Sequence, residues 1–71
     1  MTIRLAYKHQ DGPDKVREFP TIRDAATYGV AYYLTDNGYA TRKTAGMAAS
    51  VFLETGEAAC DGIEFWIEDA E

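Results

Sequence analysis

Residues 57–68 read EAACDGIEFWIE, and this stretch indicates the fold of the chain more clearly than any other. Asp61 and Gly62 form a dipeptide that favours a two-residue hairpin turn, because both central positions of that turn need a positive φ. After the turn, residues 63–68 alternate between apolar side chains and glutamate or tryptophan, which is the period of a half-buried strand. We therefore predict that a β-hairpin closes the chain.

A second hairpin is predicted at the other end of the sequence. Residues 3–8 alternate between apolar side chains and a mostly basic set, again with a period of two. The segment QDGPDK at 10–15 is typical of a turn, and VREF at 16–19 returns as a strand. The chain thus begins and ends with a pair of strands.

The middle of the sequence predicts helices. Thr21 and Asp24 resemble a capping box, and apolar residues recur at steps of three and four between residues 22 and 33. Gly38 is placed to end this first helix.

The next segment admits two interpretations. Alanines and a terminal Gly56 favour a helix over residues 44–54, whereas VFLET at 51–55 would also suit a strand. We predict the helix. Its buried side would consist of Ala45, Ala48, Ala49 and Phe52.

Together these elements predict an α+β fold with the order ββααββ, in a single compact domain over residues 1–71. We expect a small antiparallel sheet of about four strands with both helices packed on one face, because that apolar face must be covered. The alternative is a single helix against a sheet of four or five strands. A hydrophobic content of 46% is enough for a core and argues against disorder.

The composition also restricts the environment and the chemistry. The single cysteine, Cys60, cannot form an internal disulfide, and the single histidine, His9, removes the usual structural zinc sites. Both observations favour a reducing cytoplasm. The longest apolar runs, YGVAYYL and MAASVFL, are much shorter than the roughly 17 residues that a membrane span needs. We expect a soluble cytoplasmic protein.

No catalytic, cofactor or metal signature is recognisable. His9 comes just before a turn with no nucleophile or acid at a recognisable spacing, so we interpret it as a solvated loop residue. Cys60 has no basic neighbour in the sequence that would activate its thiol as a nucleophile, and we interpret it as a small packing residue. The acidic residues lack the spacing of a calcium-binding loop. We therefore expect a protein that is not an enzyme and holds neither cofactor nor metal.

The charge is distributed unevenly along the chain. The net charge is −5, but residues 1–43 carry +2, while residues 44–71 contain no lysine or arginine. The acidic residues of that second segment are Glu54, Glu57, Asp61, Glu64, Glu68, Asp69 and Glu71. Such a segment argues against direct binding to nucleic acid, which depends on basic residues, and favours a basic protein partner.

The last strand places a tryptophan among carboxylates. The side chains on its outward face are Glu64, Trp66 and Glu68. In one interpretation they pair across the sheet, Arg4 and Lys8 neutralising the glutamates while the indole packs over Ala6. In the other they form a binding surface with the indole as its anchor, since tryptophan is enriched in binding hot spots. The sequence favours neither interpretation over the other.

The candidate partner-binding residues follow from the second interpretation. They are Glu54, Glu57, Asp61, Glu64, Trp66, Glu68 and Asp69, together with Tyr28 and Tyr32. The two tyrosines lie four residues apart on the first predicted helix, where they could instead cover the edge of the core.

The chain resembles the small phage-encoded anti-CRISPR proteins in its size, its acidic charge and its architecture. The resemblance includes the hairpin-helix segment VREFPTIRDAATYGV at residues 16–30 and the acid-rich end GIEFWIEDAE at residues 62–71. The resemblance implies a non-catalytic inhibitor in the bacterial cytoplasm that binds a Cas effector or another nucleic-acid-binding protein on its basic surface. Outward residues on a strand lie roughly 6.7 Å apart, whereas duplex DNA carries a charge about every 1.7 Å along its axis. Such a DNA mimic would therefore reproduce the negative electrostatic field of DNA and not the spacing of its phosphates.

The alternative is a different class of protein. A self-associating phage structural or assembly accessory protein could use Trp66, or Met47 and Val51, to join identical chains. These residues are large and apolar, and at least the last two fall off the predicted buried side of their helix.

Overall fold

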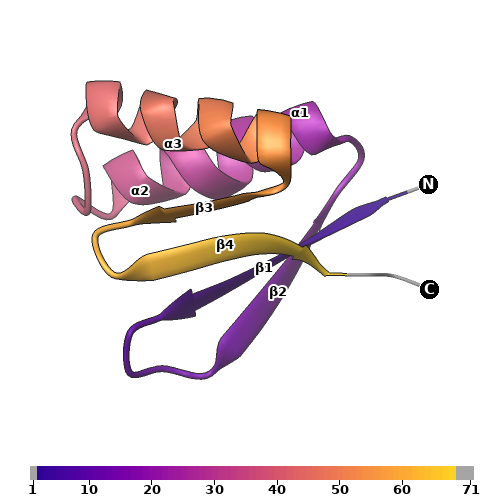
Figure 1. Cartoon of the computed structure of the whole chain (residues 1–71), viewed down its shortest axis with the longest axis horizontal. Helices are drawn as coiled ribbons and strands as arrows, with labels where there is room; N and C mark the ends of the chain where they lie inside the picture. The colour runs from indigo at the N-terminus through magenta and orange to yellow at the C-terminus, as the bar shows by residue number, and fades with distance from the viewer. Residues whose placement is uncertain (1, 69–71) are drawn as a thin grey trace.

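The computed structural model describes residues 2–68 as an antiparallel sheet with helices on one face (Figure 1). The elements are β1 (Ile3–His9), β2 (Asp14–Phe19), α1 (Ile22–Asp24), η1 (Ala25–Ala31), α2 (Tyr32–Asp36), α3 (Arg42–Thr55), β3 (Glu57–Cys60) and β4 (Ile63–Glu68). The strands of the sheet follow the order β2-β1-β4-β3. The predicted α+β fold and its element order are therefore confirmed.

The turn between β3 and β4 sets the register of the last hairpin. Asp61 has φ 54° and Gly62 has φ 79°, the signs that a type I′ turn requires at both central residues. Cys60 consequently pairs with Ile63. A slip by one residue would turn every apolar side chain of β4 away from the helices, so this turn also selects the buried face.

The first helix is continuous from α1 through η1 to α2, and it begins and ends where the sequence predicts. Thr21 Oγ1 accepts a hydrogen bond of 3.1 Å from the Asp24 N–H. Gly38 has φ 74°, and the N–H of Tyr39 donates to the carbonyl of Leu34 at 2.8 Å, which is the Schellman arrangement.

The middle of this helix, η1, is wound as a π-helix, which the sequence did not indicate. Gly29 in η1 lies directly against the sheet, where a Cβ atom would collide with Leu5 and would lie 2.9 Å from Phe19 Cε2. Glycine is therefore needed at this position for close approach and not for a special φ.

α3 confirms the predicted second helix and excludes the alternative in which VFLET forms a strand. Thr41 Oγ1 accepts from the Thr44 N–H at 3.2 Å, and Gly56 ends the helix with φ 83°. The buried residues are Ala45, Ala48 and Phe52, while Ala49 is only partly buried. Strong signals at both ends, together with burial of Phe52, override the β-propensity of residues 51–53.

The core lies between the sheet and the helices. Its largest fully buried side chains are Phe52, Phe65, Leu5, Leu34, Ile63 and Val30. Each such side chain stabilises the fold by about 1.5–3 kcal/mol relative to an exposed one. Within residues 2–68, no helix combines the length and the apolar character needed to cross a bilayer.

Candidate functional site

The face of the sheet that points away from the helices, called the open face below, carries three cross-strand rows of side chains. The central row is Val16, Ala6, Trp66 and Glu57. One flanking row is Asp14, Lys8, Glu64 and Ala59, and the other is Glu18, Arg4 and Glu68. The open face is thus an apolar centre bordered by charged residues.

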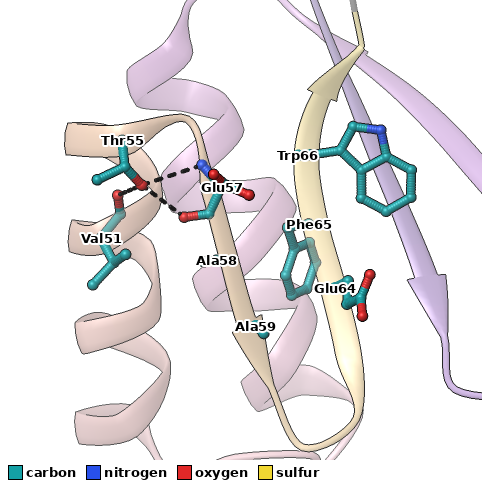
Figure 2. A pocket seen from close by; sticks show the side chains of 8 residues that line it. All are labelled: Val51, Thr55, Glu57, Ala58, Ala59, Glu64, Phe65 and Trp66. Atoms are coloured by element: carbon teal, nitrogen blue, oxygen red, sulfur yellow. Dashed lines mark hydrogen bonds between the residues drawn. The ribbon is translucent and has the colours of Figure 1, made fainter.

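The indole of Trp66 covers Ala6 at the centre of the open face. Ala6 is only 1% exposed and does not belong to the core between sheet and helices. Trp66 is its direct partner across β1 and β4, and Figure 2 shows the indole reaching from β4 toward β1. The predicted packing of Trp66 over Ala6 is confirmed, and the indole itself stays partly exposed.

Arg4 links the two glutamates of its row. Its guanidinium lies 3.0 Å from Glu18 Oε2 and 2.9 Å from Glu68 Oε1. The hydrogen bond and the charge of Glu68 raise the pKa of Arg4 above its ordinary value, with a smaller contribution from Glu18. The prediction that Arg4 neutralises a glutamate of the last strand is confirmed, with Glu68 as that glutamate, and the additional partner, Glu18, was not predicted.

Lys8 and Glu64 occupy opposite positions in the register, as the cross-strand interpretation requires. However, Arg4 is the basic residue in both ion pairs found within residues 2–68. The charged groups of Lys8 and Glu64 therefore lie more than 4 Å apart. Five carboxylates and two basic side chains share the open face. Pairing across the strands therefore leaves the open face with a surplus of three negative charges, a net value of −3.

A shallow groove of about 670 Å³ continues from the open face around β3 to α3 (Figure 2). It is lined by Val51, Thr55, Glu57, Ala58, Ala59, Glu64, Phe65 and Trp66. The small side chain of Ala59 leaves space between Glu57 and Glu64, both of which are exposed. Two unpaired carboxylates and the indole thus border one depression.

The structure brings together only part of the predicted partner-binding set. The residues that share the open face are Glu57, Glu64, Trp66 and Glu68. Asp61 lies in the turn at the end of the sheet, and Glu54 lies on α3 in the helical layer. Asp69 lies outside the described residues.

The two predicted tyrosines lie in the helical layer and not on the open face. Tyr28 belongs to η1 and Tyr32 to α2, and their ring centroids are 5.3 Å apart. Their side chains are 51% and 52% exposed, and neither is among the partly buried residues that pack against the core. The structure therefore does not unite them with Trp66 in one surface.

Sequence reasoning missed three residues of the open face, Asp14, Val16 and Glu18, which lie on β2. Residues 14–18 alternate between acidic or apolar side chains and basic ones, a pattern that indicates a strand with carboxylates on one face. The net charge of residues 44–71 does not include β2. It therefore gives no indication that β2 contributes carboxylates to the open face.

The prediction that His9 is a solvated loop residue is wrong. His9 ends β1, is partly buried, and its Nε2 lies 2.6 Å from the hydroxyl oxygen of Tyr33. The Tyr39 ring packs against it with centroids 5.3 Å apart. Desolvation raises the pKa of Tyr33 above its ordinary value. His9 continues the alternation of Ile3, Leu5 and Tyr7, which was the available signal.

Among residues 2–68, no three histidine, cysteine, aspartate or glutamate side chains converge as metal ligands would. Comparisons of the chain with protein-family models, curated proteins and solved structures found no match.

Proposed function

We propose that the protein is a non-catalytic binding protein whose open face holds a basic surface of a protein partner. The observation that carries this proposal is a partly exposed tryptophan with surplus carboxylates around it, at the centre of the sheet face that the helices of residues 2–68 leave uncovered. A large aromatic side chain supplies contact area on desolvation, and the surrounding charges accelerate encounter with a partner of opposite sign.

The partner that fits is a protein and not a nucleic acid. Phosphate backbones are bound chiefly by lysine and arginine, and the described strands place Arg4 and Lys8 on the open face against five carboxylates. Arg4 is already engaged by two glutamates. A surface rich in lysine and arginine, such as one that binds DNA or RNA, would instead gain complementary charge.

We infer further that the protein inhibits a bacterial nuclease or CRISPR-Cas complex by occupying its nucleic-acid-binding surface. The support is the small size, the net charge of −5 and the acidic open face, which together match the resemblance to anti-CRISPR proteins. In this proposal a phage supplies the protein, and it acts in the cytoplasm of the host.

The test is capture of a partner from a bacterial lysate with variants of equal charge. Glu57→Lys with Glu64→Lys reverses two carboxylates of the open face, while Asp36→Lys with Glu54→Lys makes the same change in net charge at exposed positions of the helical layer. We expect the first variant to lose a nucleic-acid-binding protein that the second still captures. Equal capture by both variants would reject the open face as the binding surface.

A second candidate, self-association as a phage structural or assembly accessory protein, is favoured by a different surface. Met47 and Val51 on α3 are 61% and 48% exposed, and both border a depression beside β3. Sedimentation equilibrium tests this candidate. A stable oligomer that dissociates after Met47→Ser with Val51→Ser would support it, and a monomer at high concentration would exclude it.

A further inference from the structure

The two edges of the sheet differ in how their backbone is protected. At the β3 edge, Thr55 Oγ1 lies 2.9 Å from the Glu57 carbonyl oxygen and 3.4 Å from the Glu57 nitrogen (Figure 2). The hydroxyl thus occupies both backbone groups with which Glu57 would bind an added strand. The edge is partly closed by the chain itself.

Within residues 2–68, the outer edge of β2 has no partner strand, and the hydrogen-bond pattern shows which of its backbone groups point outward. The N–H of Ile67 donates to the carbonyl of Gly56 at 3.2 Å, so odd-numbered residues of β4 bond toward β3 and even-numbered ones toward β1. The same alternation continues through β1 to β2. The residues of β2 whose backbone groups point away from the sheet are therefore Asp14, Val16 and Glu18.

The charges along this edge form a pattern that is the same in both directions. Residues 14–18 are Asp, Lys, Val, Arg and Glu, and all five are exposed. If a second copy paired antiparallel about Val16, Asp14 would face Glu18 of the second copy and Lys15 would face its Arg17. Shifting the centre to Lys15 or Arg17 places identical basic side chains opposite each other. Because like charges directly opposite are destabilising, the edge disfavours its own copy.

We propose that the outer edge of β2 accepts an extended segment of a different protein as an added strand. The segment would place an apolar residue opposite Val16, acidic residues opposite Lys15 and Arg17, and basic residues opposite Asp14 and Glu18. Main-chain hydrogen bonds supply affinity in such strand addition, and the side-chain pattern supplies specificity. This surface goes beyond the proposed function, since it does not involve Trp66 or the groove beside β3.

The basic residues of the added strand would lie on the open face, beside a row that already contains Asp14 or Glu18. The acidic residues would lie on the side of the helices, where Arg17 packs with its guanidinium 5.0 Å from the centre of the Phe19 ring. The charges of β2 thus determine which face of an incoming strand lies on the open face and which lies on the side of the helices. It does not by charge alone select a parallel or an antiparallel direction.

Two peptides of identical composition test the pattern by NMR titration of the isotope-labelled protein. TKEVEKT has the complementary order, and TEKVKET has the order of β2 itself. We expect TKEVEKT to shift the amide signals of Asp14, Val16 and Glu18 and to bind at least about tenfold more tightly, because four cross-strand charge pairs change sign between the peptides. Equal binding of both peptides, or no shift along β2, would overturn the proposal.

A gain of self-association provides an independent test. Asp14→Lys with Lys15→Glu keeps the net charge but would place the new lysine opposite Glu18, and the new glutamate opposite Arg17, of a second copy. Sedimentation equilibrium should show self-association on the order of tenfold tighter than that of the wild type. Adding Val16→Pro, which removes an outward N–H, should restore the wild-type behaviour. A double variant that associates no more than the wild type would contradict an accessible β2 edge.

Discussion

Ala6 is only 1% exposed and lies directly opposite Trp66 on the face of the sheet that the helices of residues 2–68 do not cover. This relationship gives the indole two properties at once. It covers the side chain of Ala6, and it remains partly exposed among carboxylates. A structural role and a binding role for Trp66 are therefore compatible, and they can be separated by substitution.

Trp66→Ala should lower the free energy of unfolding by about 2 kcal/mol, because a half-buried indole is lost and Ala6 becomes exposed. Trp66→Phe should retain most of this stability, since a smaller ring still covers part of the alanine. Urea unfolding followed by circular dichroism measures both. A change below about 0.5 kcal/mol for Trp66→Ala would show that the indole does not shield the sheet.

Gly29→Ala should destabilise the protein by about 1–3 kcal/mol, because the new methyl group would collide with Leu5 and press on Phe19. Gly46→Ala is the matched control. Gly46 lies within α3, and a Cβ atom added there would have open space within 4 Å, so the substitution should stabilise the helix by up to about 1 kcal/mol. Thermal unfolding of both variants checks this prediction. Opposite signs are expected, and equal stabilisation would contradict the close packing of η1 on the sheet.

Tyr33 should make stability depend on alkaline pH. Desolvation raises its pKa above the ordinary value of 10.0, so the folded state favours the neutral hydroxyl. This contribution is fully present below pH 10.0 and is lost as the pH rises through the higher pKa of the folded state. Urea midpoints measured across the alkaline range should fall less steeply for Tyr33→Phe than for the wild type.

The control for that experiment is Tyr32→Phe, which removes an exposed tyrosine hydroxyl and leaves the contact between Tyr33 and His9 in place. At neutral pH, Tyr33→Phe should also cost about 0.5–1.5 kcal/mol, since it removes the hydrogen bond with His9. Identical alkaline profiles for the wild type and Tyr33→Phe would contradict desolvation of the Tyr33 hydroxyl.

Thr55→Val should open the β3 edge, because it removes the hydroxyl that lies against both backbone groups of Glu57. Hydrogen exchange at the Glu57 amide should become faster, on the order of tenfold if the lost bond contributes about 1.4 kcal/mol. Thr55→Ser, which keeps the hydroxyl, should exchange at the wild-type rate. Unchanged exchange in Thr55→Val would mean that Thr55 does not protect this edge.

Local signals explain why much of the fold could be predicted from the sequence. The turn at Asp61 and Gly62, the first-helix cap at Thr21 and the helix end at Gly56 each depend on a few neighbouring residues, and each was confirmed. The π-helical winding of η1 could not be predicted, because apolar spacing does not distinguish it from an α-helix. Local propensity alone could not decide whether residues 51–55 form a helix or a strand. The helix is stabilised by the packing of α3 on the core, which is not a local property of the sequence.

The candidate surface was less predictable, because sheet order is a property of distant segments. Charge counting identified the acidic half of the chain, but it grouped Glu54 with Glu64, which the fold places in different layers. It also separated Glu18 from Glu68, which the fold joins through Arg4. Only the order of strands reveals which carboxylates share a face.

The proposed function requires that the open face bind a basic protein surface in competition with nucleic acid. The most direct measurement is binding of duplex DNA to the captured partner while this protein is added in increasing amount. We predict stoichiometric displacement of DNA that weakens as salt rises and disappears with Glu57→Lys and Glu64→Lys. A ternary complex containing the partner, DNA and this protein, unaffected by those two substitutions, would contradict the claim.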